Sequence, residues 1–182
     1  MGANLTYHER LGSGASGEVF RVTWKSKEFG TIEAAAKKIR LDEEPTAQQK
    51  SEIEFLKRLD HKNIVKYYDT VLEKKHVVIV TEYAAKGSLY DYLKDKDKLP
   101  EHLLHRWIFH LARGVNYLKE NDVAHRDLKS PNCILTADNV LKICDFGIAK
   151  DLTSTKTTES AKGSIRWIAP ELLTDFATVP ER

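Results

Sequence analysis

The chain has 182 residues, of which 41% are hydrophobic and 31% are charged, as in an ordinary folded domain. Its 29 Lys and Arg residues nearly balance 27 Asp and Glu residues, and the net charge of +2 argues against a nucleic-acid binder driven by bulk charge. With two cysteines and no apolar run long enough to span a bilayer, the composition excludes a disulfide scaffold and integral membrane contact and favours a reducing compartment, the cytoplasm.

The first residues match a lipidation pattern, because Gly2 and Thr6 stand where N-myristoylation requires them. The alternative, which we favour, is that Thr6 and Tyr7 begin a strand. A single acyl chain would in any case hold a membrane only weakly.

A glycine-rich run follows, between two predicted strands. It consists of Gly12, Ser13, Gly14, Ala15, Ser16 and Gly17, with strand-forming side chains after it at Val19, Phe20, Val22 and Trp24. Glycines let the backbone close over phosphates and offer N–H groups to them. A strand rather than a helix follows the run, and no Gly-Lys-Ser/Thr is present, so neither a dinucleotide-binding loop nor a Walker loop is predicted.

The next strand is predicted over Ile32–Ile39 and carries two adjacent lysines. On a strand, Ala35 and Lys37 share one face, and Lys38 points to the other. The small Ala35 leaves room for a flat base while Lys37 reaches phosphate. In a competing register Lys38 takes this role, and in a third interpretation both lysines are solvated.

A helix is predicted to begin at Thr46, because Thr46 and Gln49 form the Thr-x-x-Gln pattern of a capping box. Apolar residues recur at helical spacing at Ile53, Leu56 and Leu59. Glu52 lies one turn before Leu56 on the same face and 15 residues after Lys37 (52 − 37 = 15). We expect Glu52 to pair with Lys37, although an isolated glutamate on a helix is usually solvated.

Beyond a buried strand at Val77–Val80, the pattern changes from strands to helices. Glu82–Lys86 joins the two halves, and a crevice between them is a natural ligand site. The later elements are helices around Leu89–Leu93 and Leu103–Leu118 and short strands at Cys133–Leu135 and Leu141–Ile143. The predicted fold class is therefore α+β with two lobes.

The strongest chemical signal comes from two short runs, HRDLKSPN at 125–132 and DFG at 145–147. Phosphoryl transfer needs a carboxylate that orients the acceptor, oxygen ligands for magnesium and cations that cover the phosphates. Asp127 suits the first role, and Asn132 and Asp145 offer hard oxygens for Mg²⁺. Lys129 brings an ammonium near the transferred phosphate. Any one of these could be a plain loop residue, but the whole set in this order predicts phosphoryl transfer.

From Gly12 to the Ala-Pro-Glu run at 169–171, the sequence resembles the eukaryotic protein kinase family. The resemblance implies ATP and Mg²⁺ as cofactors and protein serine or threonine as the phosphate acceptor. It implies a complete N-lobe at residues 1–84, formed by an antiparallel sheet plus one helix. It also implies a partial helical C-lobe at residues 85–182. It favours Lys37 over Lys38 as the functional lysine. The predicted catalytic set is therefore Asp127, Lys129, Lys37 and Glu52.

The resemblance also predicts the nucleotide site. Its expected members are Leu11, Gly12, Ser13, Gly14, Ala15, Ser16, Gly17, Val19, Ala35, Lys37, Thr81, Glu82, Ala84 and Ile134. Val19, Ala35 and Ile134 would enclose adenine. Glu82 and Ala84 would offer backbone hydrogen bonds at the hinge, with Thr81 as gatekeeper. An apolar stack across the lobes is implied for Leu56, Tyr67, Phe146 and His125.

Lys129 and the Gly-Ser pair at 163–164 resemble serine/threonine kinases rather than tyrosine kinases. Segments 79–83, 87–92 and 141–145 resemble the tyrosine-kinase-like branch, nearest to MAP kinase kinase kinases of the mixed-lineage and zipper sterile-alpha type. That resemblance implies a downstream MAP kinase kinase as protein substrate, in a stress cascade. Regulatory phosphorylation is predicted among Thr157, Thr158 and Ser160.

The kinase pattern ends early, because only 172–182 follow the Ala-Pro-Glu run. We therefore expect a C-terminally truncated kinase that is poorly stable and poorly active on its own. The alternative is a catalytically silent nucleotide-binding or scaffolding fragment. Cys144 directly precedes Asp145 and is predicted at the back of the ATP site, where a nearby lysine and magnesium could lower its pKa.

Overall fold

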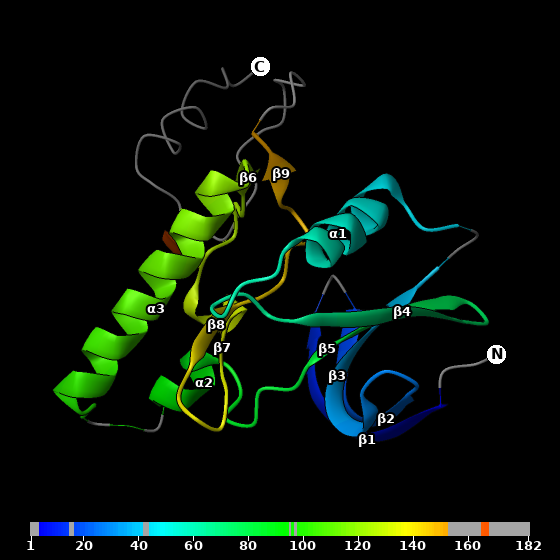
Figure 1. The fold of residues 1–182 in the computed structure, drawn as a ribbon, viewed down its shortest axis with the longest axis horizontal. Helices are drawn as coiled ribbons and strands as arrows, with labels where there is room; N and C mark the ends of the chain where they lie inside the picture. Colours follow the sequence, from blue (N-terminus) through cyan, green and yellow to red (C-terminus); the bar gives the residue numbers. More distant parts are fainter. Residues whose placement is uncertain are drawn as a thin grey trace, which may run out of the picture.

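The computed structural model describes residues 4–14, 17–41, 44–94, 96, 98–152 and 165–167 (Figure 1). Predictions that fall outside these residues concern Gly2, Ala15, Ser16, Thr157, Thr158, Ser160, Ser164 and the run at 169–171. No helix in the described part of the chain is long and apolar enough to cross a membrane.

A five-stranded antiparallel sheet forms the first half of the described chain, in the order β1-β2-β3-β5-β4. Its strands are β1 (Asn4–Gly14), β2 (Gly17–Ser26), β3 (Gly30–Arg40), β4 (Tyr67–Glu73) and β5 (His76–Glu82). Helix α1 (Ala47–Arg58) connects β3 to β4 and lies against the sheet (Figure 1). The prediction of an antiparallel sheet with one helix is confirmed.

The second half is mainly helical and lies to the other side of α1 (Figure 1). Its helices are α2 (Leu89–Lys94) and α3 (Glu101–Glu120), with single 3-10 turns at Ser130–Asn132 and Ile165–Trp167. Two short antiparallel ladders join β6 (Val123–Ala124) to β9 (Lys150–Asp151) and β7 (Cys133–Leu135) to β8 (Leu141–Ile143). This arrangement confirms the predicted α+β class with a partial helical lobe.

The two faces of strand β3 differ in burial, as the alternation of its side chains predicts. Ala34 and Ala36 are fully buried on one face, in a cluster with Val22, Trp24, Val78 and Val80. Ala35 and Lys37 are half-buried on the other face. β3 is hydrogen-bonded to β2 on one side and to β5 on the other, so it presents Lys37 from a rigid support.

The start of α1 is fixed by the predicted capping box. The Thr46 side chain accepts a hydrogen bond from the Gln49 amide at 3.2 Å, and the Gln49 side chain accepts one from the Thr46 amide at 2.8 Å. Both bonds satisfy N–H groups that a helix start otherwise leaves unpaired. The helix then buries Glu52, Phe55 and Leu56 on one face.

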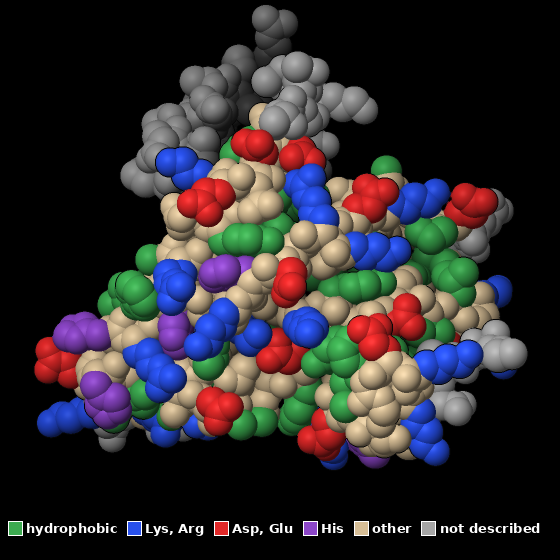
Figure 2. Space-filling view, viewed as in Figure 1, with side chains coloured by type: hydrophobic (Ala, Val, Ile, Leu, Met, Phe, Trp, Pro, Cys, Tyr) green, Lys and Arg blue, Asp and Glu red, His purple; other side chains and the backbone are tan. Residues whose placement is uncertain are grey.

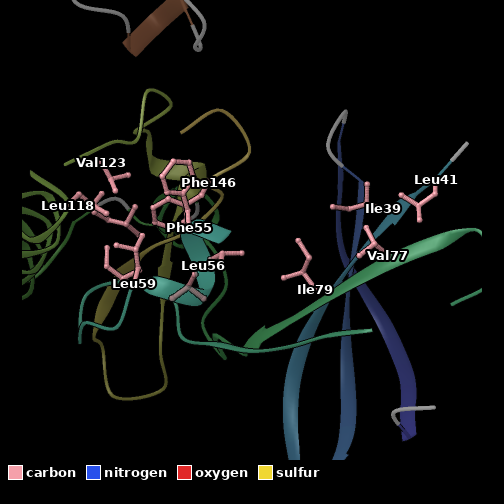
Figure 3. Packing of buried hydrophobic residues seen from close by; sticks show 13 residues of the cluster. Ile39, Leu41, Phe55, Leu56, Leu59, Val77, Ile79, Leu118, Val123 and Phe146 are labelled. Atoms are coloured by element: carbon pink, nitrogen blue, oxygen red, sulfur yellow. The ribbon is translucent and has the colours of Figure 1, made fainter. Parts of the chain in front are cut away.

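One apolar cluster connects α1 to the sheet on one side and to the second half on the other (Figure 3). Ile39 and Ile79 come from the sheet, Leu56 from α1, and Ile143 and Phe146 from the chain after α3. Phe146 is 1% exposed. The residue just after Asp145 is therefore anchored in the core, and this anchoring positions Asp145.

The molecular surface carries mixed charge. Figure 2 shows Lys and Arg side chains interspersed with Asp and Glu over the visible face. This agrees with the near balance of charges in the composition.

Candidate active site

The glycine-rich run lies where β1 turns back into β2. The register pairs Gly12 with Val19 and Gly14 with Gly17. Gly17 has φ +125°, and a Cβ atom there would lie 2.6 Å from the Lys38 carbonyl oxygen. At Gly12 and Gly14 a Cβ atom would meet no atom of the described residues within 4 Å. Among the described residues nothing crowds these two glycines, as close approach of a phosphate requires.

Replacing Gly17 with alanine is therefore expected to destabilise the protein by about 1–3 kcal/mol, because the backbone is strained for any L-residue and the methyl group meets a carbonyl. Gly12→Ala and Gly14→Ala are matched controls in open space. Thermal unfolding should show a lower midpoint for Gly17→Ala alone. Equal midpoints for all three variants would contradict this account of the turn.

Lys37 lies between two carboxylates. Its Nζ is 2.6 Å from Oε1 of Glu52 and 3.1 Å from Oδ1 of Asp145. Lys38 lies on the opposite face, where its Nζ is 3.5 Å from Glu73 and 5.3 Å from the Tyr7 ring centroid. The structure thus brings the predicted residues Lys37, Glu52 and Asp145 together and keeps Lys38 apart from them.

The electrostatics of this trio keep the lysine charged. Burial disfavours the ammonium, but Glu52 and Asp145 outweigh burial and hold the pKa of Lys37 above its ordinary value. Burial also opposes ionisation of Asp145, yet Lys37 and a backbone hydrogen bond involving Gly147 leave the pKa of Asp145 lowered. Burial raises the pKa of Glu52, against the pull of Lys37. Asp145 is therefore an anionic oxygen donor at neutral pH.

Asp127, Lys129 and Asn132 form a second group in the loop between β6 and β7. The Asn132 amide donates to the Asp127 backbone carbonyl at 2.9 Å and to its Oδ2 at 3.0 Å. Lys129 Nζ lies 2.8 Å from the same Oδ2. These contacts fix the orientation of the Asp127 carboxylate.

His125 links the two groups in a way that sequence reasoning missed, since the sequence predicted it only as part of an apolar stack. Its Nε2 bonds the Cys144 carbonyl at 2.9 Å, and its Nδ1 accepts from the Asp127 amide at 3.3 Å. A carbonyl only accepts, so the proton sits on Nε2. Burial lowers the pKa of His125, which favours this neutral form. The imidazole thereby sets the position of Asp127 relative to Asp145. The only sequence feature that could have indicated this contact is that His125 lies two residues before Asp127.

Members of the predicted apolar stack lie in or against one core cluster, and one of them contacts the His125 ring. Leu56 and Phe146 belong to one core cluster, and Tyr67 packs against it. The rings of His125 and Phe146 lie 5.0 Å apart, edge to face.

The predicted adenine residues come from three strands, with Val19 in β2, Ala35 in β3 and Ile134 in β7. Ala35 pairs with Thr81, and Val19 pairs with Lys37. The backbone after β5 is tied to β7, since the Lys86 amide donates to the Leu135 carbonyl at 3.0 Å. Of the other predicted members of the nucleotide site, Glu82, Ala84 and Ile134 are half-buried, and Leu11 and Ser13 are exposed. The Glu82 carboxylate pairs with Lys142 at 2.7 Å, and the Glu82 backbone amide donates to the Lys66 carbonyl at 2.8 Å.

The donor set fits a magnesium ion shared with phosphates rather than a protein-only metal cage. No group of three or more His, Cys, Asp or Glu side chains suited to a metal occurs among residues that the structure describes. Asn132 directs its amide nitrogen to Asp127, so its amide oxygen remains for a cation. With the Asp145 carboxylate this makes two hard oxygen donors, and Mg²⁺ typically takes one or two from protein and the rest from phosphate and water.

The expectation of a lowered Cys144 pKa is wrong. Burial raises it, and Asp145 adds to the rise. Burial also raises the pKa of Cys133 to about 11.

Alkylation by iodoacetamide at neutral pH should accordingly be slow at both cysteines, on the order of 100-fold or more below a free thiol. Cys144 should still react before Cys133, because Cys144 is half-buried and Cys133 is 2% exposed. We expect this difference in access to outweigh the larger rise in the pKa of Cys144. Mass spectrometry of the folded protein gives the order. Rapid labelling of Cys133 first would contradict this placement.

Comparison with known proteins gives one family. The Protein kinase domain family matches residues 5–180. Mitogen-activated protein kinase kinase kinase 13 of Homo sapiens is 37% identical over 163 residues, 90% of this chain and 16% of the relative. The probable serine/threonine-protein kinase SIS8 of Arabidopsis thaliana is 38% identical over 177 residues, 93% of this chain and 17% of the relative. Cytokinesis protein sepH of Aspergillus terreus is 37% identical over 164 residues, 90% of this chain and 12% of the relative.

The chain thus spans under one fifth of the length of these relatives. The match nevertheless covers nearly all of the chain itself, including both groups of polar residues described above. The predicted resemblance to protein kinases of the MAP kinase kinase kinase kind is confirmed. The chain belongs to the protein kinase domain family.

Proposed function

We propose that this chain carries out ATP-dependent phosphorylation of serine or threonine in proteins. The observation that carries the proposal is the juxtaposition of two polar groups. Lys37, held by Glu52, reaches Asp145, while Asp127 is oriented by Asn132 and Lys129. His125 fixes the relation between the groups.

Each residue then has a role that its position supports. Lys37 binds the phosphates and is kept in place by Glu52. Asp145 and Asn132 would hold magnesium, which would neutralise charge on the phosphates of ATP while the terminal phosphoryl group passes to the acceptor oxygen and ADP leaves. Asp127 orients the acceptor hydroxyl and takes its proton, and Lys129 covers the developing negative charge. Val19, Ala35 and Ile134 enclose the adenine, with Thr81 behind it and the backbone of Glu82 and Ala84 beside it.

The finer assignments rest on the relatives and on the motifs. A relative named a MAP kinase kinase kinase supports a MAP kinase kinase as the substrate. A stress cascade in the cytoplasm is part of this proposal and rests on the resemblance of the motifs alone. Lys129 and a relative named a probable serine/threonine-protein kinase support hydroxyl acceptors on serine and threonine. The division into lobes at residues 84 and 85 also belongs to this proposal.

The proposal is tested with the intact protein, magnesium-ATP labelled on the terminal phosphate and three peptides that differ only in carrying serine, threonine or tyrosine. We expect transfer to serine and threonine. Transfer to tyrosine alone would overturn the acceptor assignment. Nucleotide binding by calorimetry without any transfer would favour the alternative of a silent nucleotide-binding fragment.

A further inference from the structure

Both ends of α1 contact the stretch of chain that follows Asp145. The helix carries Glu52, so its placement decides whether Glu52 can reach Lys37. Apolar packing alone fixes α1 loosely along its own axis, because dispersion contacts are not directional. Directional contacts at its two ends therefore bear on the geometry of the site.

The first contact is made by Gln48, one turn before Glu52 and on the same face. Its Nε2 donates to the Gly147 carbonyl at 2.6 Å. Gly147 is also close to both carboxylates, since a Cβ atom there would lie 3.3 Å from Oδ1 of Asp145 and 3.5 Å from Oε2 of Glu52. Gln48 thus binds the turn that follows Asp145 and links it to α1.

The second contact is made by Arg58, the last residue of α1. Its guanidinium lies 3.3 Å and 3.2 Å from the two carboxylate oxygens of Asp151 and donates to the Asn121 carbonyl at 3.4 Å. Asp151 lies in β9 and pairs with Val123 of β6, just before His125. Figure 1 shows α1 between the five-stranded sheet and β9. Arg58 thus ties the far end of α1 to both chain segments that lead into the site.

The two contacts are separated by ten residues (58 − 48 = 10), about 15 Å along a helix, so together they fix the tilt as well as the position of α1. Arg58 and Asp151 side chains are 45% and 37% exposed. An ion pair this exposed contributes little to the free energy of unfolding. Its effect falls on the placement of α1 rather than on stability.

We propose that Gln48 and Arg58 are positioning residues that hold α1 to the segment 147–151, so that Glu52, Lys37 and Asp145 stay aligned. The inference rests on the proposed function, since it assigns these residues a part in phosphoryl transfer. Displacing a reacting group by about 1 Å can cost on the order of 100-fold in rate.

The test uses the intact protein with Arg58→Asp, Asp151→Arg, the double exchange of both, and Gln48→Ala. Lys57→Asp, a charge change at the exposed neighbouring residue, is the control. We expect each of the first two variants and Gln48→Ala to lower kcat roughly 10-fold or more, with an unchanged KM for peptide and an unchanged melting midpoint. The double exchange should restore kcat to within about threefold, because it rebuilds the pair. Loss of kcat without restoration, or an equal loss in Lys57→Asp, would overturn the proposal.

Amide hydrogen exchange gives a readout that does not need activity. The Arg58→Asp variant should exchange faster over 47–58 and 147–151, and the double exchange should reverse this. If the wild-type protein transfers no phosphate, the proposed function fails, yet these exchange rates still decide the inference. Unchanged exchange in both segments would overturn it even in an active kinase.

Discussion

Replacing Asp127 with asparagine is expected to lower the rate of phosphoryl transfer by about 10²–10⁴-fold while leaving ATP affinity and folding intact. The asparagine side chain has the same shape, and its amide oxygen can still accept from Asn132 and Lys129, which lie 3.0 Å and 2.8 Å from Oδ2 in the wild type. What the variant loses is a carboxylate able to take the proton of the acceptor hydroxyl.

The measurement is kcat for peptide phosphorylation, together with calorimetric ATP binding and the melting midpoint. Asp138→Asn, at an exposed turn residue between β7 and β8, is the matched control and should behave as wild type. A rate for Asp127→Asn within threefold of wild type would refute the assigned role of Asp127.

The second large effect is expected at Lys37. Replacing it with methionine leaves Glu52 and Asp145 facing each other without their shared cation. Removing one partner from a buried ion pair lowers the free energy of unfolding by about 3–5 kcal/mol. If about 3 kcal/mol of the interaction also acts on ATP binding or on the transition state, the affinity or the rate falls by about 100-fold. Lys38→Met removes only a partly exposed contact with Glu73 and should lower the free energy of unfolding by about 1 kcal/mol or less.

ATP affinity and kcat measured on both variants test the difference. The pH dependence gives a second readout. Lys37 lowers the pKa of Asp145, so its loss should raise that pKa and move the acidic limb of activity to higher pH. Equal effects of Lys37→Met and Lys38→Met would mean that the assigned face of β3 is wrong.

The sequence predicted that Lys37 and Glu52 would lie together because the motifs that carry them are local. The register of β3 follows from the alternation around Lys37, and the capping box fixes where α1 begins and hence where Glu52 points. These features need only neighbours within a few residues.

Contacts between distant segments were not predictable in the same way. Strand β4 was missed because its residues are mostly half-buried and show no clean alternation, so its pairing with β5 defines it. The ladder of β6 and β9 is two residues long on each side, too short for any periodic signal. Gln48 meets a carbonyl 99 residues away and Arg58 a carboxylate 93 residues away, and no local pattern marks either.

The two carboxylates that bind Lys37 lie at very different distances from it along the chain, and this affects the order of folding. Lys37 and Glu52 are 15 residues apart, whereas Lys37 and Asp145 are 108 residues apart. During synthesis the five-stranded sheet and α1 are complete by Glu82, so the first ion pair can form while the second half is still being made. The long-range closure that brings Asp145 to the lysine must follow, and contacts of such large sequence separation form slowly. Until then the nascent chain exposes the face of α1 that Phe146 later covers, which makes this interval the one in which the polypeptide is most open to aggregation.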